Sequence, residues 1–164
     1  MKNWWLFAAL VASFSAHVAA ADSLPEPGSF YMGFLKEDIN QSGVFELGMK
    51  GQVNRFVDAN AALMWFGNND NVYNGFNFGA HLTTGTWPIK AYAGAGLFLG
   101  EHDECDEQDT DICETDYVAG VYPEVGVELS FFQLNVAAYG RYYKTSDTGK
   151  NEYKMFGAYI GYDF

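Results

Sequence analysis

The sequence is poor in basic residues and has no long apolar segment. It contains 9 Lys and Arg residues against 21 Asp and Glu residues, which gives a formal net charge of −12. Proteins that bind nucleic acids neutralise phosphates with basic stripes, so we expect no nucleic-acid partner. No apolar stretch reaches the roughly 20 residues that a membrane-spanning helix requires. The length of 164 residues suits a single domain.

The first twenty residues have the pattern of a secretory signal. A positive start with Lys2 precedes an apolar core over 4–12, and the segment ends in the small residues Ala19, Ala20 and Ala21. The length of this core falls in the range of about 7–15 residues that is typical of signal peptides. We predict a cleavable signal peptide over 1–20, with cleavage after Ala20 or Ala21, and one domain over 21–164. An uncleaved anchor is the alternative.

The sequence has only two cysteines, Cys105 and Cys113, with seven residues between them. An exported protein reaches an oxidising compartment, where such a pair is expected to form a disulfide. Two thiols alone are too few ligands for a structural zinc site. We therefore predict a Cys105–Cys113 disulfide.

The remaining sequence lacks a helix-period apolar stripe and shows a period of two instead. Alternation covers 44–53, 59–66, 75–82, 90–99, 121–129, 133–142 and 155–164, and the segment 30–35 is apolar on both faces. The connections alternate between short segments at 54–58, 84–88 and 130–132 and longer ones at 38–42, 67–72, 101–116 and 144–151. This pattern predicts an all-β, eight-stranded antiparallel up-and-down barrel. Pro123 falls inside the sixth strand, where we expect a bulge or pairing that starts only after it.

The two faces of these strands differ in a way that predicts a transmembrane barrel. The apolar faces, which include Phe76, Val127 and Ile160, carry no charge, whereas the other faces hold many glycines and tyrosines. A soluble barrel would turn the apolar faces inward and carry many charges outside, and a membrane barrel does the reverse. Six charged residues are then expected to form a balanced network in the lumen: Glu46, Lys50, Lys90, Glu124, Glu128 and Arg141. We expect Lys90 and Glu128, at one level of neighbouring strands, to form the best pair.

The end of the chain has alternating apolar residues and a final phenylalanine. The alternating positions are Phe156, Ala158, Ile160, Tyr162 and Phe164. With this terminus, the chain over 21–164 resembles the small eight-stranded outer-membrane barrels of Gram-negative bacteria, the class of OmpA, OmpX and OmpW. The resemblance implies a location in the cell outer membrane, termini in the periplasm and the longer loops outside. It also implies that the barrel-insertion machinery reads the terminal segment, and that outer-membrane lipids and lipopolysaccharide are partners. We expect a monomer.

Nine of the 21 acidic residues lie between positions 101 and 116. Carboxylate oxygens suit Ca²⁺ and Mg²⁺, which makes Asp103, Asp106, Asp109 and Asp111 candidate ligands. The spacing is not that of an EF-hand, and acidic runs are usually solvated. We therefore expect no cofactor, with Ca²⁺ or Mg²⁺ binding as the alternative.

No motif for catalysis joins the candidate side chains. His81 lies on the predicted lumen face and is expected to be a hydrogen-bonded residue, and nothing in the sequence connects His102 with Ser146. In an eight-stranded barrel side chains fill the interior, so we expect no open pore. The predicted function is a non-catalytic outer-membrane barrel with a structural or surface-interaction role. The alternatives are a lipid A deacylase or acyltransferase in the outer membrane, and a soluble periplasmic barrel that binds apolar ligands.

Overall fold

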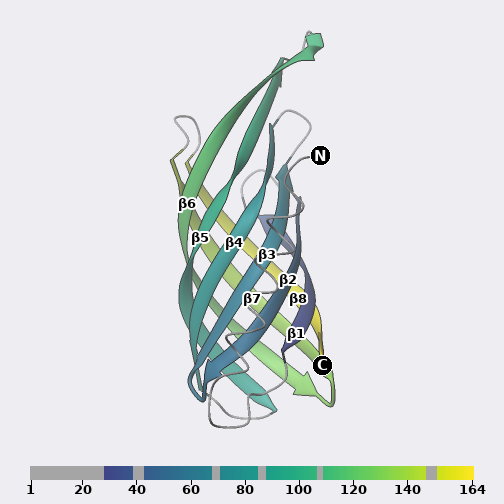
Figure 1. Cartoon of the computed structure of the whole chain (residues 1–164), viewed down its shortest axis with the longest axis vertical. Coiled ribbons are helices and arrows are strands. Elements are labelled where there is room, and N and C mark those ends of the chain that lie inside the picture. The colour runs from purple at the N-terminus through teal and green to yellow at the C-terminus, as the bar shows by residue number, and fades with distance from the viewer. Residues whose placement is uncertain (1–27, 39–42, 68–70, 85–87, 107–108, 147–150) are drawn as a thin grey trace.

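The strands in the described part of the chain pair in sequence order, and β1 pairs with β8 to close a barrel (Figure 1). This computed structural model describes residues 28–38, 43–67, 71–84, 88–106, 109–146 and 151–164, with the backbone alone at 71, 103–106 and 109–114. The strands are β1 (Ser29–Glu37), β2 (Gly43–Asn54), β3 (Val57–Gly67), β4 (Asn71–Thr83), β5 (Ile89–Asp106), β6 (Asp109–Phe131), β7 (Leu134–Thr145) and β8 (Glu152–Asp163). All neighbouring strands are antiparallel, which confirms the predicted eight-stranded up-and-down barrel.

The predicted signal peptide and its cleavage site lie outside the described residues, so they remain predictions. Among the residues that are described, no helix is long and apolar enough to cross a membrane.

The burial of side chains alternates along the strands in the sense predicted for a membrane barrel. Val127 and Ile160 are 51% and 52% exposed, whereas Glu46 and Arg141 are 0% and 4% exposed. A soluble barrel requires the opposite arrangement, because exposed apolar side chains gain nothing from contact with water. The interpretation as a soluble barrel with an apolar interior is therefore wrong.

Strands β5 and β6 are much longer than the sequence indicated. They pair without interruption as far as Cys105 opposite Cys113, and in Figure 1 they rise above the other strands at the end away from the C-terminus. The prediction of a long loop over 101–116 is therefore wrong. Apolar alternation in a sequence indicates a strand with one buried face. This extension lies beyond the lumen, where the backbone hydrogen bonds of a ladder can form without a buried apolar face.

Pro123 does not produce the expected bulge. Strand β6 pairs with β7 at Val121 opposite Lys144 and again at Glu124 opposite Arg141, with the same register on both sides of the proline. The pairing with β5 continues through Pro123 opposite Ala95. The missing N–H donor is thus accommodated by a local gap in one ladder, and pairing begins well before the proline.

Candidate functional site

The centre of the lumen is occupied by the guanidinium group of Arg141. Arg141 on β7 donates from Nη1 to Glu46 on β2 and from Nε to Glu124 on β6. The guanidinium carbon also lies 4.9 Å from the ring centroid of Tyr122 and 4.8 Å from that of Tyr139. One cation therefore meets two carboxylates and two aromatic faces, the arrangement that a buried arginine requires.

Neutral side chains satisfy the remaining acceptors around this cation. Asn77 donates from Nδ2 to Glu46 Oε1 at 2.6 Å, and the Tyr139 hydroxyl donates to Glu46 Oε2 at 2.9 Å. The Tyr143 hydroxyl lies 3.0 Å from both Asn77 Nδ2 and Arg141 Nη1. We call the set Arg141, Glu46, Glu124, Asn77, Tyr139 and Tyr143 the Arg141 cluster. Of its members, the alternating charge pattern indicated Arg141, Glu46 and Glu124, and nothing in the sequence marked Asn77.

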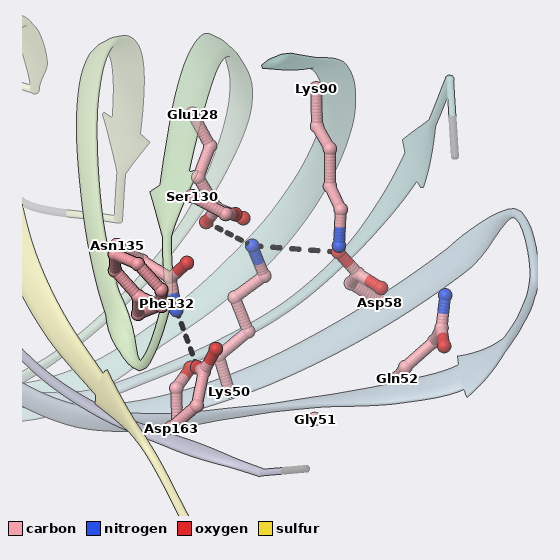
Figure 2. Close-up of a pocket in the computed structure, with 11 residues that line it drawn as sticks. Lys50, Gly51, Gln52, Asp58, Lys90, Glu128, Ser130, Phe132, Asn135 and Asp163 are labelled. Carbon is pink, nitrogen blue, oxygen red and sulfur yellow. Dashed lines mark hydrogen bonds and ion pairs between the residues drawn. The ribbon is translucent and has the colours of Figure 1, made fainter. Parts of the chain in front are cut away.

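A second group of charges lies nearer the end with the short turns. Lys50 Nζ is 2.6 Å from Glu128 Oε2 and 3.4 Å from Asp58 Oδ2, and Tyr159 also donates its hydroxyl to Glu128 (Figure 2). Lys90 and Glu128 are register partners as predicted, and both line the same cavity as Asp58 (Figure 2). The backbone register therefore sets the level of these charges, and Lys50 from β2 forms an ion pair with Glu128. The Lys90–Glu128 ion pair stays a prediction.

These residues line a cavity of about 220 Å³ that includes the carboxylate of Asp163. Asn135 donates from Nδ2 to Asp163, and Ser29, Gln52 and Ser130 complete a polar surface (Figure 2). Asp58 was not predicted to line the lumen because it falls in a predicted turn. Asp163 was not predicted to do so because it lies among the apolar residues of the last strand.

Aromatic side chains pack together inside the barrel toward the long β5–β6 hairpin. Phe66, Tyr73 and Tyr153 pack on one another with ring centroids 5.1–5.9 Å apart, and all three are buried. The Tyr73 and Tyr153 hydroxyls share a hydrogen bond of 2.8 Å. The three rings therefore form a packed aromatic layer inside the barrel, contributed by β3, β4 and β8.

Two inward-facing tyrosines fit only because glycines stand opposite them. A Cβ atom at Gly96 would collide with the ring and hydroxyl of Tyr122, and one at Gly126 would collide with Tyr92. The frequent glycines on the inner faces therefore make room for large rings in a narrow barrel.

Each of the three candidate side chains for catalysis contacts other residues of the barrel. His81 is buried, with Nε2 3.3 Å from Glu124 Oε1. His102 is also buried, and its ring stacks on Tyr73 with centroids 4.2 Å apart. Ser146 is exposed, and its hydroxyl oxygen accepts a hydrogen bond of 3.1 Å from the Ala119 amide.

The proposed metal ligands and the cysteine pair fall in the segment where only the backbone is described. Asp103, Asp106, Asp109 and Asp111 lie in the extension of β5 and β6, and their side chains are outside the described residues. Elsewhere, within the described side chains, no group of three potential ligands gathers. The backbone register places Cys105 opposite Cys113, and the disulfide itself remains a prediction.

The predicted insertion signal lies on the outside of β8. Phe156, Ala158, Ile160, Tyr162 and Phe164 are all exposed, and Phe164 stacks on Phe30 of β1 with ring centroids 4.8 Å apart. These side chains are on the surface that faces lipid in a membrane barrel, where another protein can also reach them.

The fold matches that of solved outer-membrane proteins, although the sequences are distant. Neisserial surface protein A shares 15% identity with a TM-score of 0.66, covering 85% of this chain and 96% of its own. The N-terminal barrel domain of Pseudomonas aeruginosa OprF shares 12% identity with a TM-score of 0.60, covering 85% and 99%. The outer-membrane enzyme PagL shares 10% identity with a TM-score of 0.54, covering 83% and 99%.

Comparisons of the sequence itself give no relative. No protein-family model matches the chain, and no curated protein matches it. The structural likenesses establish the fold of the small eight-stranded outer-membrane barrels, and together with the apolar exterior they support the expected location in the outer membrane.

Proposed function

We propose that this protein is a non-catalytic outer-membrane barrel with a closed lumen, serving envelope structure or surface interaction. The main support is the Arg141 cluster, which joins strands β2, β6 and β7 across the middle of the barrel. A buried cation of this kind is stable only with its carboxylates in place, so the cluster is expected to act as a permanent cross-brace.

The packing on both sides of the cluster favours the same role. The aromatic layer of Phe66, Tyr73 and Tyr153 covers it toward the β5–β6 hairpin, and the rings of Tyr122 and Tyr139 lie against it. An ion path needs continuous water, and we expect these packed side chains to interrupt it. The polar cavity at the opposite end is then a mouth that does not continue through the lumen, and a closed lumen is the expected state.

Planar-bilayer recording tests the closed lumen. We expect no stable conductance from the reconstituted protein under conditions in which an open bacterial porin, used as the positive control, conducts. A stable large conductance from the unmodified protein contradicts the proposal. Before the recording, the unheated and boiled samples are compared by gel electrophoresis. A difference in their mobility shows that the barrel is folded.

The β5–β6 hairpin is the part best suited to surface interaction. It extends beyond the other strands at the end opposite the C-terminus, and it contains the acidic segment (Figure 1). Outer-membrane lipids and lipopolysaccharide are the proposed partners of the barrel wall, because the exposed apolar side chains require an apolar surrounding.

Replacement of His102 and Ser146 distinguishes this proposal from the enzyme alternative. Lipid A from cells that express the unmodified protein, His102→Ala or Ser146→Ala is compared by mass spectrometry. We expect identical lipid A in all strains and in cells without the protein. A mass change that depends on the unmodified protein and disappears in either variant supports the enzyme instead.

A further inference from the structure

The barrel has a polar cavity at the end with the short turns, lined by the residues around Asp163. It holds about 220 Å³, and roughly 150 Å³ is enough for a cavity to bind a benzene molecule. The C-terminus lies at the same end, which is expected to face the periplasm (Figure 1). We call this space the mouth cavity. A small molecule or a single side chain from the periplasm is therefore of a size to enter it.

The charged side chains of the mouth cavity do not balance. Among the described residues its lining has a formal charge of −1, from three carboxylates and two ammonium groups: Asp58, Glu128, Asp163, Lys50 and Lys90. Lys50 Nζ lies 2.6 Å from Glu128 Oε2 and 3.4 Å from Asp58 Oδ2. Asp163 instead accepts a hydrogen bond from the neutral amide of Asn135 (Figure 2). The excess negative charge is therefore expected at Asp163, where it attracts a cation.

Asp163 belongs to a continuous row of polar side chains across four strands. Ser29 on β1 is its register partner, and Asn135 on β7 is the register partner of Ser130 on β6. Ser29, Asn135 and Ser130 are all buried, and all three line the mouth cavity. A primary ammonium group has three N–H donors, which need several oxygen acceptors close together. A carboxylate with hydroxyl and amide oxygens on both sides meets this requirement.

Phe132 places an aromatic ring at the edge of this row in spite of an unfavourable backbone conformation. It is the first residue of the two-residue turn between Phe131 and Leu134, and its φ is 55°. Glycine and asparagine are favoured at such a position, because a bulky side chain crowds the backbone at positive φ. The Phe132 side chain lines the mouth cavity and is 84% exposed, so its own burial does not offset this strain. Strain at an exposed side chain points to a role in binding, and an aromatic ring attracts a cation and packs against its methylene groups.

We propose that the mouth cavity binds a primary alkylammonium ion, with the ammonium group on Asp163 and the alkyl chain against Phe132. The inference goes beyond the proposed function, which assigns no ligand to the barrel interior. The same chemical group occurs in free amines and at the end of lysine side chains. The ligand is thus a small amine of the periplasm or a lysine of a periplasmic polypeptide, and either one neutralises the excess charge of the lining.

NMR titration of the folded barrel in detergent micelles tests the site with n-butylammonium as the probe. The reporter is the side-chain amide signal of Asn135, because this amide donates to Asp163. We expect the signal to shift with a dissociation constant of about 1–10 mM, since one charge-assisted hydrogen bond and one aromatic contact hold the ion. Butanol has the same shape without the charge and is expected to bind about ten-fold more weakly. Equal shifts with the two probes, or no shift with n-butylammonium, overturn the proposal.

Variants of Asp163 locate the ammonium group. Asp163→Asn is expected to weaken binding of n-butylammonium about ten-fold, whereas Asp163→Glu keeps the charge and is expected to recover most of the loss. Glu152→Gln, which removes an exposed acid on the outside of β8, is the control and should bind as the unmodified protein does. Unchanged binding in a folded Asp163→Asn overturns the proposal. If this variant does not fold, the comparison of n-butylammonium with butanol on the unmodified protein still decides.

A variant of Phe132 separates binding from stability. Phe132→Gly is expected to weaken binding about three-fold. Its urea midpoint should stay level or rise, because glycine adopts a positive φ without strain. Phe56→Gly is the matched control, since Phe56 is an exposed residue of another short turn outside the lining of the mouth cavity. Binding to Phe132→Gly that equals binding to Phe56→Gly contradicts the role given to Phe132.

Two further comparisons identify the source of the ammonium group and separate this inference from the proposed function. A blocked lysine tripeptide that binds more tightly than n-butylammonium indicates a polypeptide ligand, and weaker binding of the tripeptide indicates a small amine. If the unmodified protein shows no heat-dependent gel mobility or conducts as a pore, the proposed function fails. If the protein is a folded, closed barrel but the Asn135 signal does not distinguish n-butylammonium from butanol, the ammonium site alone is wrong.

Discussion

Arg141 and Glu46 meet across the width of the lumen although 95 residues separate them in sequence and their strands, β7 and β2, are not neighbours. The pair therefore connects parts of the wall that the backbone ladders leave independent. Its burial makes the loss of either partner costly, because the other charge is then left without compensation in a place that water does not reach.

Arg141→Met is expected to lower the free energy of unfolding by about 3–5 kcal/mol, because Glu46 and Glu124 remain buried as like charges. Urea titration of the folded barrel, followed by unheated gel mobility, measures the change. Lys144→Met is the control, since Lys144 and Glu152 form an exposed pair at 4.0 Å. Its cost is expected to stay below about 1 kcal/mol. Equal costs for the two variants contradict the role given to Arg141.

A double-mutant cycle identifies the ion-pair partner of Glu128. Lys50→Met and Glu128→Gln are combined and compared with Lys90→Met and Glu128→Gln. We expect a coupling energy of about 1–3 kcal/mol for Lys50, because its ammonium lies 2.6 Å from Glu128. The coupling for Lys90 should be smaller. A larger value for Lys90 would show that Lys90 is the main partner of Glu128.

Arginine substitutions on the outside of β6 report the depth of the membrane. Val127→Arg is expected to cost about 2–4 kcal/mol, because its side chain faces the apolar part of the bilayer. Phe131→Arg, at the end of the same strand, is expected to cost about 0–1 kcal/mol. Both values come from urea unfolding in lipid vesicles. Similar small costs at the two positions would mean that β6 does not face lipid as described.

Gly96→Ala is expected to destabilise the barrel by about 1–3 kcal/mol, because its Cβ atom collides with Tyr122 and with the Phe78 carbonyl. Gly43→Ala is a matched control on β2, since a Cβ atom there meets nothing within 4 Å. Its effect should be close to zero. The double variant Gly96→Ala with Tyr122→Phe should recover only a small part of the loss, because it removes the hydroxyl contact but leaves those with the ring carbon Cζ and the Phe78 carbonyl.

Thiol labelling of unreduced protein tests the Cys105–Cys113 disulfide. We expect no alkylation until a reductant is added, because the backbone register places the two residues opposite each other. Closing this small ring contributes about 2–3 kcal/mol in the chain-entropy model. Reduction should leave the unheated gel mobility unchanged, since the pair lies beyond the lumen. Alkylation of both thiols in the unreduced, folded protein would rule the disulfide out.

The sequence was sufficient to predict the barrel because burial on one face imposes a period of two on each strand. Alternation around Phe76, Val127 and Ile160 identified strands and also the face directed toward lipid. The same signal failed over 101–116, because the acidic residues there interrupt the apolar period although the backbone continues as paired strands. Hydrophobic alternation identifies only strands that have one apolar face shielded from water.

The sequence predicts which residues point into the lumen, but it does not predict which of them interact with one another. The lumen position of Lys50, Lys90 and Glu128 follows from alternation within each strand. Which lysine reaches Glu128 depends on side chains that cross the barrel between strands that are not neighbours. Asn77 is hidden from such reasoning for the same reason, because its role exists only beside Glu46.

The unequal strand lengths leave one side of the long hairpin without a neighbour. The ladder between β6 and β7 starts at Gly120 opposite Thr145, so the part of β6 from Asp109 to Ala119 pairs with β5 alone along most of its length. Among the described residues, the ladder between β6 and β7 therefore stops short of the tip of β6. Unpaired strand edges are places where another extended chain can add, and charged residues along an edge disfavour such pairing. The sequence puts Asp109, Asp111, Glu114 and Asp116 along this stretch of β6, which disfavours pairing with a second copy of the same strand.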